Sequence, residues 1–202
     1  MLTATIASTF SVGGIAFTSQ ASRSAAGQIG HNITLPAGVA GAISAAGVDG
    51  LATGHGIAGS DVVDVHWTDP ADGTHKCRRG LTVDTANAND IEFDETPTGE
   101  GDALPAEDTA VIVGLQVEVN TDFDGDDMEI VAVRSSQRAV IDFRDAAASL
   151  SAVKLPAAEA WSWVSGQGVA NPLTGDPVDK AVASNGSTTA ATLNLGILYA
   201  SA

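Results

Sequence analysis

The sequence predicts an all-β protein, an antiparallel β-sandwich or jelly roll with Gly- and Ala-rich loops. Three observations favour this class: apolar and β-branched residues recur in short runs, turn residues separate these runs at close spacing, and few stretches suit a helix. Many short strands with frequent turn signals are typical of sandwiches and jelly rolls. We expect one structural domain over residues 1–202, with a possible subdivision near 100–109.

The N-terminal strands are expected at 3–12, 15–18 and 28–35. The first two flank Gly13-Gly14 and form a hairpin, and residues 19–27 are expected to be a loop. Pro36 ends the third strand because proline cannot donate to a β-ladder. The Gly- and Ala-rich segment 37–59 is expected to be extended or looped, and a short helix remains possible over 39–46.

A second hairpin is predicted from strands 61–67 and 74–84 around the turn 69–73. Alternation along the first strand separates Val63, Val65 and Trp67 from Asp64 and His66. His66 and His75 are then expected to face each other across the hairpin. Two interpretations follow, a metal-binding pair or ordinary surface histidines, and we prefer the second.

The segment 110–143 contains three β-rich runs joined by one acidic loop and one short polar turn. We predict that it forms a β-meander onto which the other strands pack. Further strands are expected at 91–93, 146–155 (as a strand or a brief helix), 160–164, 178–183 and 188–200.

The chain is strongly acidic, with 25 Asp and Glu residues against nine Lys and Arg residues and a net charge of -16. Such a surface repels phosphate backbones and anionic lipids, so we expect no nucleic-acid partner and no membrane attachment. The single cysteine, Cys77, excludes an internal disulfide and a multi-cysteine metal site, and we expect a buried or inert thiol. The N-terminus has no signal-peptide pattern, so we expect synthesis in the cytoplasm, after which the protein either stays there or leaves as part of a particle.

An acidic loop offers Asp122, Asp124, Asp126 and Glu129 as candidate calcium ligands around Gly125. Calcium prefers several hard oxygen ligands on a tight loop, and a glycine among aspartates permits the turn. The spacing departs from that of an EF-hand. The alternative is a turn capped by solvated aspartates. Apart from possible calcium, no cofactor is expected.

Two clusters are candidate interface sites. Arg78 and Arg79 belong to the basic run 75–79, which either docks on an acidic neighbouring subunit or protects a strand edge by charge. Trp161 and Trp163 share one strand face and suit an interface anchor, a carbohydrate platform or packing within a sheet.

No catalytic constellation is apparent, so we predict a protein that is not an enzyme. Gly54, Gly56 and Gly59 match the dinucleotide fingerprint only as a string, because a strand follows them where a helix is required. Asp142 and Asp145 are spaced like a carboxylate pair, but ion pairing with the arginine between them explains them better than glycosidase chemistry.

Two stretches, 54–67 and 171–199, resemble uncharacterised acidic, Ala- and Gly-rich virion structural proteins of bacteriophages and planctomycete-like sequence sets. The resemblance implies a structural virion protein, either a capsid decoration or a tail-associated subunit. Such a protein would act in the virion as a homo-oligomer that contacts copies of itself and other virion proteins. The resemblance assigns no role to any individual residue. The alternative is a calcium- or carbohydrate-binding β-sandwich module.

Overall fold

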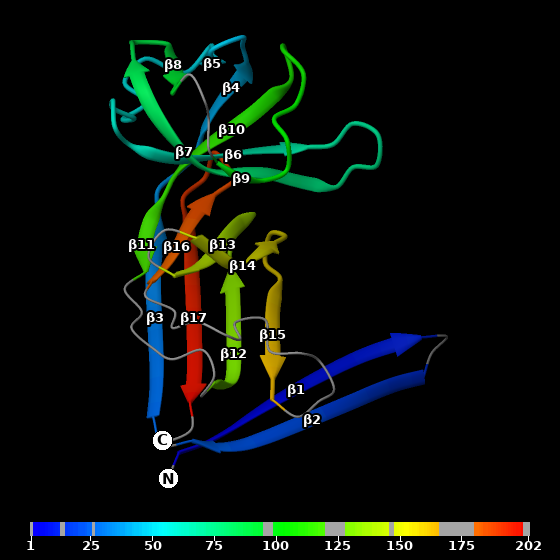
Figure 1. The fold of residues 1–202 in the computed structure, drawn as a ribbon. Helices are drawn as coiled ribbons and strands as arrows, with labels where there is room; N and C mark the ends of the chain where they lie inside the picture. The colour runs from blue at the N-terminus through cyan, green and yellow to red at the C-terminus, as the bar shows by residue number, and fades with distance from the viewer. Residues whose placement is uncertain are drawn as a thin grey trace.

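The structure, a computed structural model, describes residues 2–12, 15–25, 27–94, 99–119, 128–145, 148–165 and 180–199. All regular elements in these ranges are β-strands, and every pair of neighbouring strands is antiparallel (Figure 1). The prediction of an all-β fold is confirmed. These ranges include no helix with the length and apolarity needed to cross a membrane.

The first structural unit is a closed six-stranded barrel, called the barrel below. In the sheet order β6-β10-β4-β5-β8-β7, the last strand pairs with the first, and the short β9 adds to β7. Its apolar interior includes Val63, Val65 and Leu81. The strands are β4 (Val39–Ile43), β5 (Gly47–Asp49), β6 (Val62–Thr68), β7 (His75–Ala86), β8 (Asp90–Phe93), β9 (Glu100–Gly101) and β10 (Ala110–Leu115).

The second unit consists of two four-stranded sheets, called the paired sheets below. One has the order β15-β12-β17-β3 and the other the order β11-β16-β13-β14. A single hydrophobic cluster takes residues from both, for example Leu193 from the first and Ile141 from the second. The strands are β3 (Gly27–Leu35), β11 (Val117–Val119), β12 (Met128–Ser135), β13 (Ala139–Asp145), β14 (Ala148–Leu155), β15 (Ala160–Val164), β16 (Lys180–Asn185) and β17 (Ala191–Tyr199).

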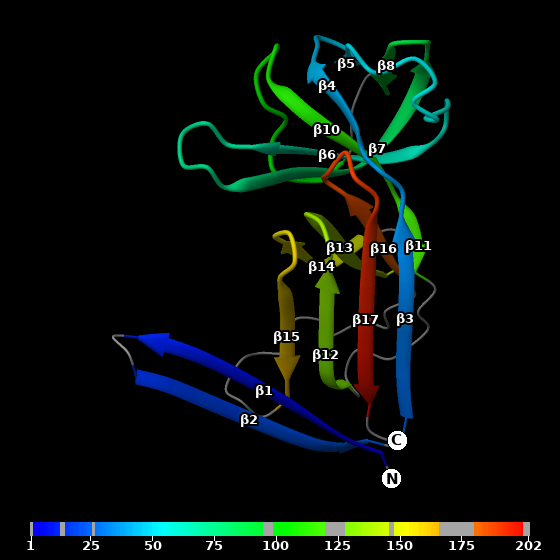
Figure 2. The same ribbon diagram turned by 180° about the vertical axis from the view of Figure 1, so that it is seen from behind.

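The chain passes from the paired sheets into the barrel and back. β3 leads into the barrel strands, and the chain returns after β10 directly into β11. A third feature is the arm, the hairpin of β1 (Leu2–Val12) and β2 (Ile15–Ala25), which forms a two-stranded sheet of its own. Figures 1 and 2 show the arm projecting from the end of the paired sheets that lies away from the barrel.

The predicted meander is wrong. Its runs do form strands, but β12 lies between β15 and β17, while β13 lies between β14 and β16. β11, β12 and β13 alternate between the paired sheets, so none of them pairs with the next, and β12 finds its partners in the later strands β15 and β17. Adjacent β-rich runs often pair, but only as a tendency.

Two local predictions are also corrected. The possible helix over 39–46 is instead β4 and the bend that leads into β5, and the backbone of β4 pairs with β5 and β10. The predicted loop over 19–27 contains the second half of β2, which pairs with β1 as far as Ala25. The strand alternative for 146–155 corresponds to β14, and the predicted strand 160–164 corresponds to β15.

The turn between β16 and β17 packs against the barrel through glycines. A Cβ added to Gly114 on β10 would lie 2.6 Å from the backbone oxygen of Asn185, and one added to Gly186 would lie 3.0 Å from the His66 ring. The Asn185 side chain donates to the backbone oxygens of Pro36 and Thr189, at 2.9 and 2.8 Å. The two units therefore approach one another closely enough to exclude side chains at these positions.

We expect Gly114→Ala to lower the free energy of unfolding by about 1–3 kcal/mol, because the new methyl group displaces a backbone turn that hydrogen bonds hold in place. Gly196→Ala is the matched control: a Cβ there has no atom within 4 Å, and its effect should be close to zero. Urea denaturation followed by tryptophan fluorescence measures both. Equal effects of the two substitutions would contradict the close approach.

Candidate functional site

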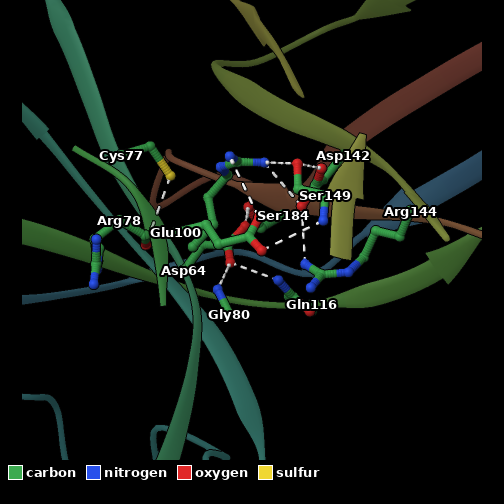
Figure 3. A network of polar contacts seen from close by, with 11 residues as sticks. Asp64, Cys77, Arg78, Gly80, Glu100, Gln116, Asp142, Arg144, Ser149 and Ser184 are labelled. Atoms are coloured by element: carbon green, nitrogen blue, oxygen red, sulfur yellow. Dashed lines mark hydrogen bonds and ion pairs between the residues drawn. The ribbon is translucent and has the colours of Figure 1, made fainter. Parts of the chain in front are cut away.

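Buried polar side chains gather where the barrel meets the paired sheets, and we call this cluster the polar seam. Figure 3 shows how side chains of the barrel strands meet those of the paired sheets there. Each of its members is buried or partly buried. The polar seam consists of Asp64, His66, Cys77 and Arg79 from the barrel, Gln116 from the connection to β11, and Asp142, Ser149 and Ser184 from the paired sheets.

A β-bulge turns β7 towards the polar seam. The register between β6 and β7 shifts opposite Asp64, and Gly80 at this point has a φ of 70°. A bulge of this kind favours glycine because other residues rarely adopt positive φ. On one side of the bulge Leu81 belongs to the barrel core, and on the other side Cys77 and Arg79 belong to the polar seam.

Asp64 is the acceptor at the centre of the polar seam. It is 1% exposed and accepts hydrogen bonds from the Gly80 backbone N–H at 2.9 Å, the Gln116 amide at 2.7 Å and the Ser184 hydroxyl at 2.5 Å. Burial raises the pKa of Asp64, whereas these donors and the nearby Arg79 charge act to lower it. Three donors converging on one carboxyl group favour its ionised form.

The histidine pair continues this hydrogen-bond chain. Because Ser184 donates its proton to Asp64, its oxygen accepts from Nε2 of His66 at 3.0 Å. Nδ1 of His66 must then accept from Nε2 of His75, at 3.1 Å, and the two rings stack with centroids 5.4 Å apart. Nδ1 of His75 remains as a buried acceptor that has no hydrogen-bond partner among the residues that the structure describes. In this series of hydrogen bonds each donor therefore lies farther from Asp64 than its acceptor: His75 donates to His66, His66 to Ser184, and Ser184 to Asp64.

Burial keeps both histidines neutral at neutral pH. It lowers the pKa of His66 well below the ordinary value and the pKa of His75 to about 4, and nearby Arg138 and Lys154 act in the same direction. The prediction that His66 and His75 face each other is confirmed. The expectation of surface histidines is wrong for His66, which is fully buried.

A buried ion-pair cluster forms the other half of the polar seam. Asp142 is 1% exposed, and its Oδ2 lies 2.8 Å from Nη1 of Arg79 and 2.9 Å from Nη1 of Arg144. The Ser149 hydroxyl donates to Oδ1 of Asp142 at 2.5 Å and accepts from Arg79 at 3.0 Å. The pair with Arg144 matches the local ion-pairing interpretation of Asp142. The pair with Arg79, in which a carboxylate of the paired sheets meets an arginine of the barrel, was not predicted.

The Ser184–His66 contact has the separation of a nucleophile and its base, but its proton order is the reverse of what catalysis requires. A general base must accept the hydroxyl proton, whereas His66 donates to Ser184, whose own proton goes to Asp64. Ser184 is also fully buried. The geometry gives no support to a nucleophilic serine here.

A metal ion would find suitable donor types, but two of the three donor groups are protonated. Ligand atoms of Asp64, His66 and Cys77 lie within 4.8 Å of one another, and carboxylate, imidazole and thiolate groups are all zinc ligands. Burial and the charge of Asp64 raise the pKa of the Cys77 thiol well above its usual value. Nε2 of His66 is already occupied by a proton donated to Ser184. Binding would therefore disrupt the hydrogen-bond chain.

The remaining candidate residues lie elsewhere. Asp122, Asp124 and Asp126 lie outside the described residues, so the calcium loop stays a prediction. Glu129 is on β12, where it is half-buried and accepts a hydrogen bond from the Ser165 hydroxyl.

Of the four candidate interface residues, Arg79 and Trp163 are buried, and Arg78 and Trp161 are partly buried. Trp163 is in the core of the paired sheets, and Trp161 packs against that core, which matches the sheet-packing interpretation. Arg78 is half-buried, and Arg79 is committed to Asp142 inside the chain. An interface role for these residues stays a prediction.

Comparison of the chain with protein-family models, with curated proteins and with solved structures finds no match in any of the three. The polar seam includes residues that sequence reasoning missed, namely Gln116, Ser149 and Ser184. Gln116 and Ser184 bind Asp64, which is 52 and 120 positions away, and Ser149 joins the nearby Asp142 to Arg79, 70 positions away, so no local pattern marks these residues. The available local signals were Gly80 inside a strand and Asp64 between buried valines.

We expect Asp142→Asn to lower the free energy of unfolding by about 3 kcal/mol or more, because Arg79 and Arg144 would lose the buried carboxylate that lies 2.8 and 2.9 Å from them. Asp69→Asn is the control with the same charge change, since Asp69 lies 3.9 Å from Lys76 in a partly exposed pair and should cost less than about 1 kcal/mol. Chemical denaturation at neutral pH compares them. Similar losses would show that the buried cluster is no stronger than a surface pair.

The stability of the protein is expected to fall as the pH drops from 6.5 towards 4. In this window the unfolded chain protonates His75, whose ordinary pKa is 6.5, while the folded chain, with a pKa of about 4, does not. A proton bound only by the unfolded state costs about 1.4 kcal/mol per pH unit. His66 acts in the same direction, and the raised pKa of Asp64 in the opposite one.

The matched variant for this effect is His75→Gln, whose amide can still donate to Nδ1 of His66 but does not titrate. Denaturation curves at several pH values between 7 and 4.5 should show a smaller loss of stability for this variant than for the unmodified protein. An unchanged pH slope would show that His75 titrates alike in the folded and unfolded states.

Proposed function

We propose that this chain is a non-enzymatic structural protein of a virus particle, a capsid decoration or a tail-associated subunit that contacts copies of itself and other virion proteins. One observation carries the proposal: the side chains best suited to chemistry are buried and used to join the barrel to the paired sheets. Asp64, His66, Asp142 and Ser184 are each at most 1% exposed.

A reactive group must reach its substrate, and these groups are enclosed. Their hydrogen bonds and ion pairs run between the two units, for example from Arg79 to Asp142 and from Ser184 to Asp64. Buried polar contacts of this kind fix one geometry, because misplacing either partner leaves a buried group unsatisfied. A fixed shape is what a subunit of a regular assembly needs.

The overall form supports the same proposal. The barrel and the paired sheets lie end to end, and the arm extends from the far end (Figure 2). We further propose that the paired sheets are a β-sandwich, because one hydrophobic cluster takes residues from both of them. The acidic surface is consistent with solubility at high subunit concentration.

The proposal predicts that the chain occupies regular positions in particles from its native source. Electron microscopy of such particles, with antibodies against the purified protein as a label, tests this directly. Density for the barrel and the paired sheets at symmetry-related positions would support the proposal. Particles that lack the chain, together with recovery of all the protein in the particle-free fraction, would overturn it.

A further inference from the structure

The arm leaves strand edges without partners. β1 pairs with β2 from Leu2 opposite Ala25 to Val12 opposite Ile15, and within the described residues neither strand joins another sheet. An isolated two-stranded hairpin is only marginally stable in water. Its outer edges also present rows of unpaired backbone groups to any neighbouring chain. An arm of this length therefore calls for a partner.

The register of the arm separates an apolar face from a polar one. Residues directly opposite each other in an antiparallel pair lie on the same face, and faces alternate along each strand. The positions of Ile6 opposite Ala21, Phe10 opposite Phe17 and Val12 opposite Ile15 thus share one face, which is mainly apolar. That face also includes the pair Ser8 and Ser19 and, near the base of the arm, Arg23. The positions between them are mostly Thr and Ser, such as the pair Thr9 and Thr18.

Charge is distributed unevenly between the arm and the rest of the chain. The two strands of the arm contain no Asp or Glu and one basic residue, Arg23. The remainder carries all 25 acidic residues against eight basic ones. Two copies of the body therefore repel one another, whereas an arm can approach an acidic body without that cost.

We propose that the arm docks through its apolar face on a second copy of this chain, and that two copies exchange their arms reciprocally. This inference rests on the proposed assembly function and names the partner. β2 contacts β12 of the paired sheets near the base of the arm, but the far part of the arm projects away from the barrel and the sheets in both views, which disfavours own-chain docking along its full length (Figures 1 and 2). Reciprocal exchange also gives the closed two-fold symmetry most common among homo-oligomers.

The size of the arm supports reciprocal exchange over a single contact. Strands of 11 residues are about 36 Å long, and a two-stranded face is about 10 Å wide. One docked face would bury about 700 Å² on both partners together, which is below the range of stable interfaces. Two exchanged arms would bury about 1,400 Å², which is within that range.

Sedimentation velocity of the purified full-length protein over a range of concentrations tests the proposal. We expect dimers, and we expect the double variant Phe10→Ser, Phe17→Ser to weaken the dimer by about a hundredfold or more, since two apolar side chains are lost from each arm. The control is the double variant Thr9→Ser, Thr18→Ser, which changes the neighbouring pair on the other face and should leave the dimer intact. Val12→Ser with Ile15→Ser is a second variant on the apolar face.

Unchanged tryptophan fluorescence and thermal unfolding would show that a variant keeps the fold of the body. An unmodified protein that stays monomeric up to its solubility limit would overturn the inference, as would a dimer that both apolar-face variants leave unchanged. The proposed function fails separately. A dimer that is missing from particles refutes the virion role alone, and a monomer found at regular particle positions refutes arm exchange alone.

Discussion

The contact between Arg79 and Asp142 is the constraint on which the shape of this molecule depends. The barrel and the paired sheets each bury their own apolar residues, so their junction has to be made by other groups. A buried ion pair is a demanding solution, because desolvation opposes it unless the geometry is strict and the remaining hydrogen-bonding groups are satisfied. Here Arg144 and Ser149 complete the environment of the carboxylate. The polarity of the junction thus selects one orientation of the two units.

Two small backbone devices make this junction possible. The bulge at Gly80 moves Arg79 and Cys77 out of the alternation that would otherwise direct them into the barrel core with Leu81. On the opposite side, Gly186 allows the β16–β17 turn to approach the ring of His66. The hydrogen bonds from His75 to His66 and from His66 to Ser184 then form at the junction of the two units. Their donors and acceptors are set by one contact, because Ser184 donates its proton to the Asp64 carboxylate.

Alternation in the sequence located most strands and even the facing histidines, because these features depend on residues near one another in the chain. The same reasoning failed for the meander: alternation shows that β12 and β13 are strands but does not show which strands they pair with. The polar seam escaped prediction for a related reason. Arg79 looked like an exposed basic residue, and only the fold brings it to Asp142, 63 positions later in the chain.

One strand connects the arm to the polar seam, and this bears on assembly. β3 follows β2 almost directly and pairs along all nine of its residues with β17, so the base of the arm is part of an extensive ladder. At its other end, the oxygen of Pro36 accepts from the Asn185 side chain, in the turn that packs against the barrel. The direction of the arm's base and the orientation of the barrel are therefore set by the same framework. A neighbouring copy that holds the arm also places the barrel, so contact at one end of the subunit specifies the position of the other.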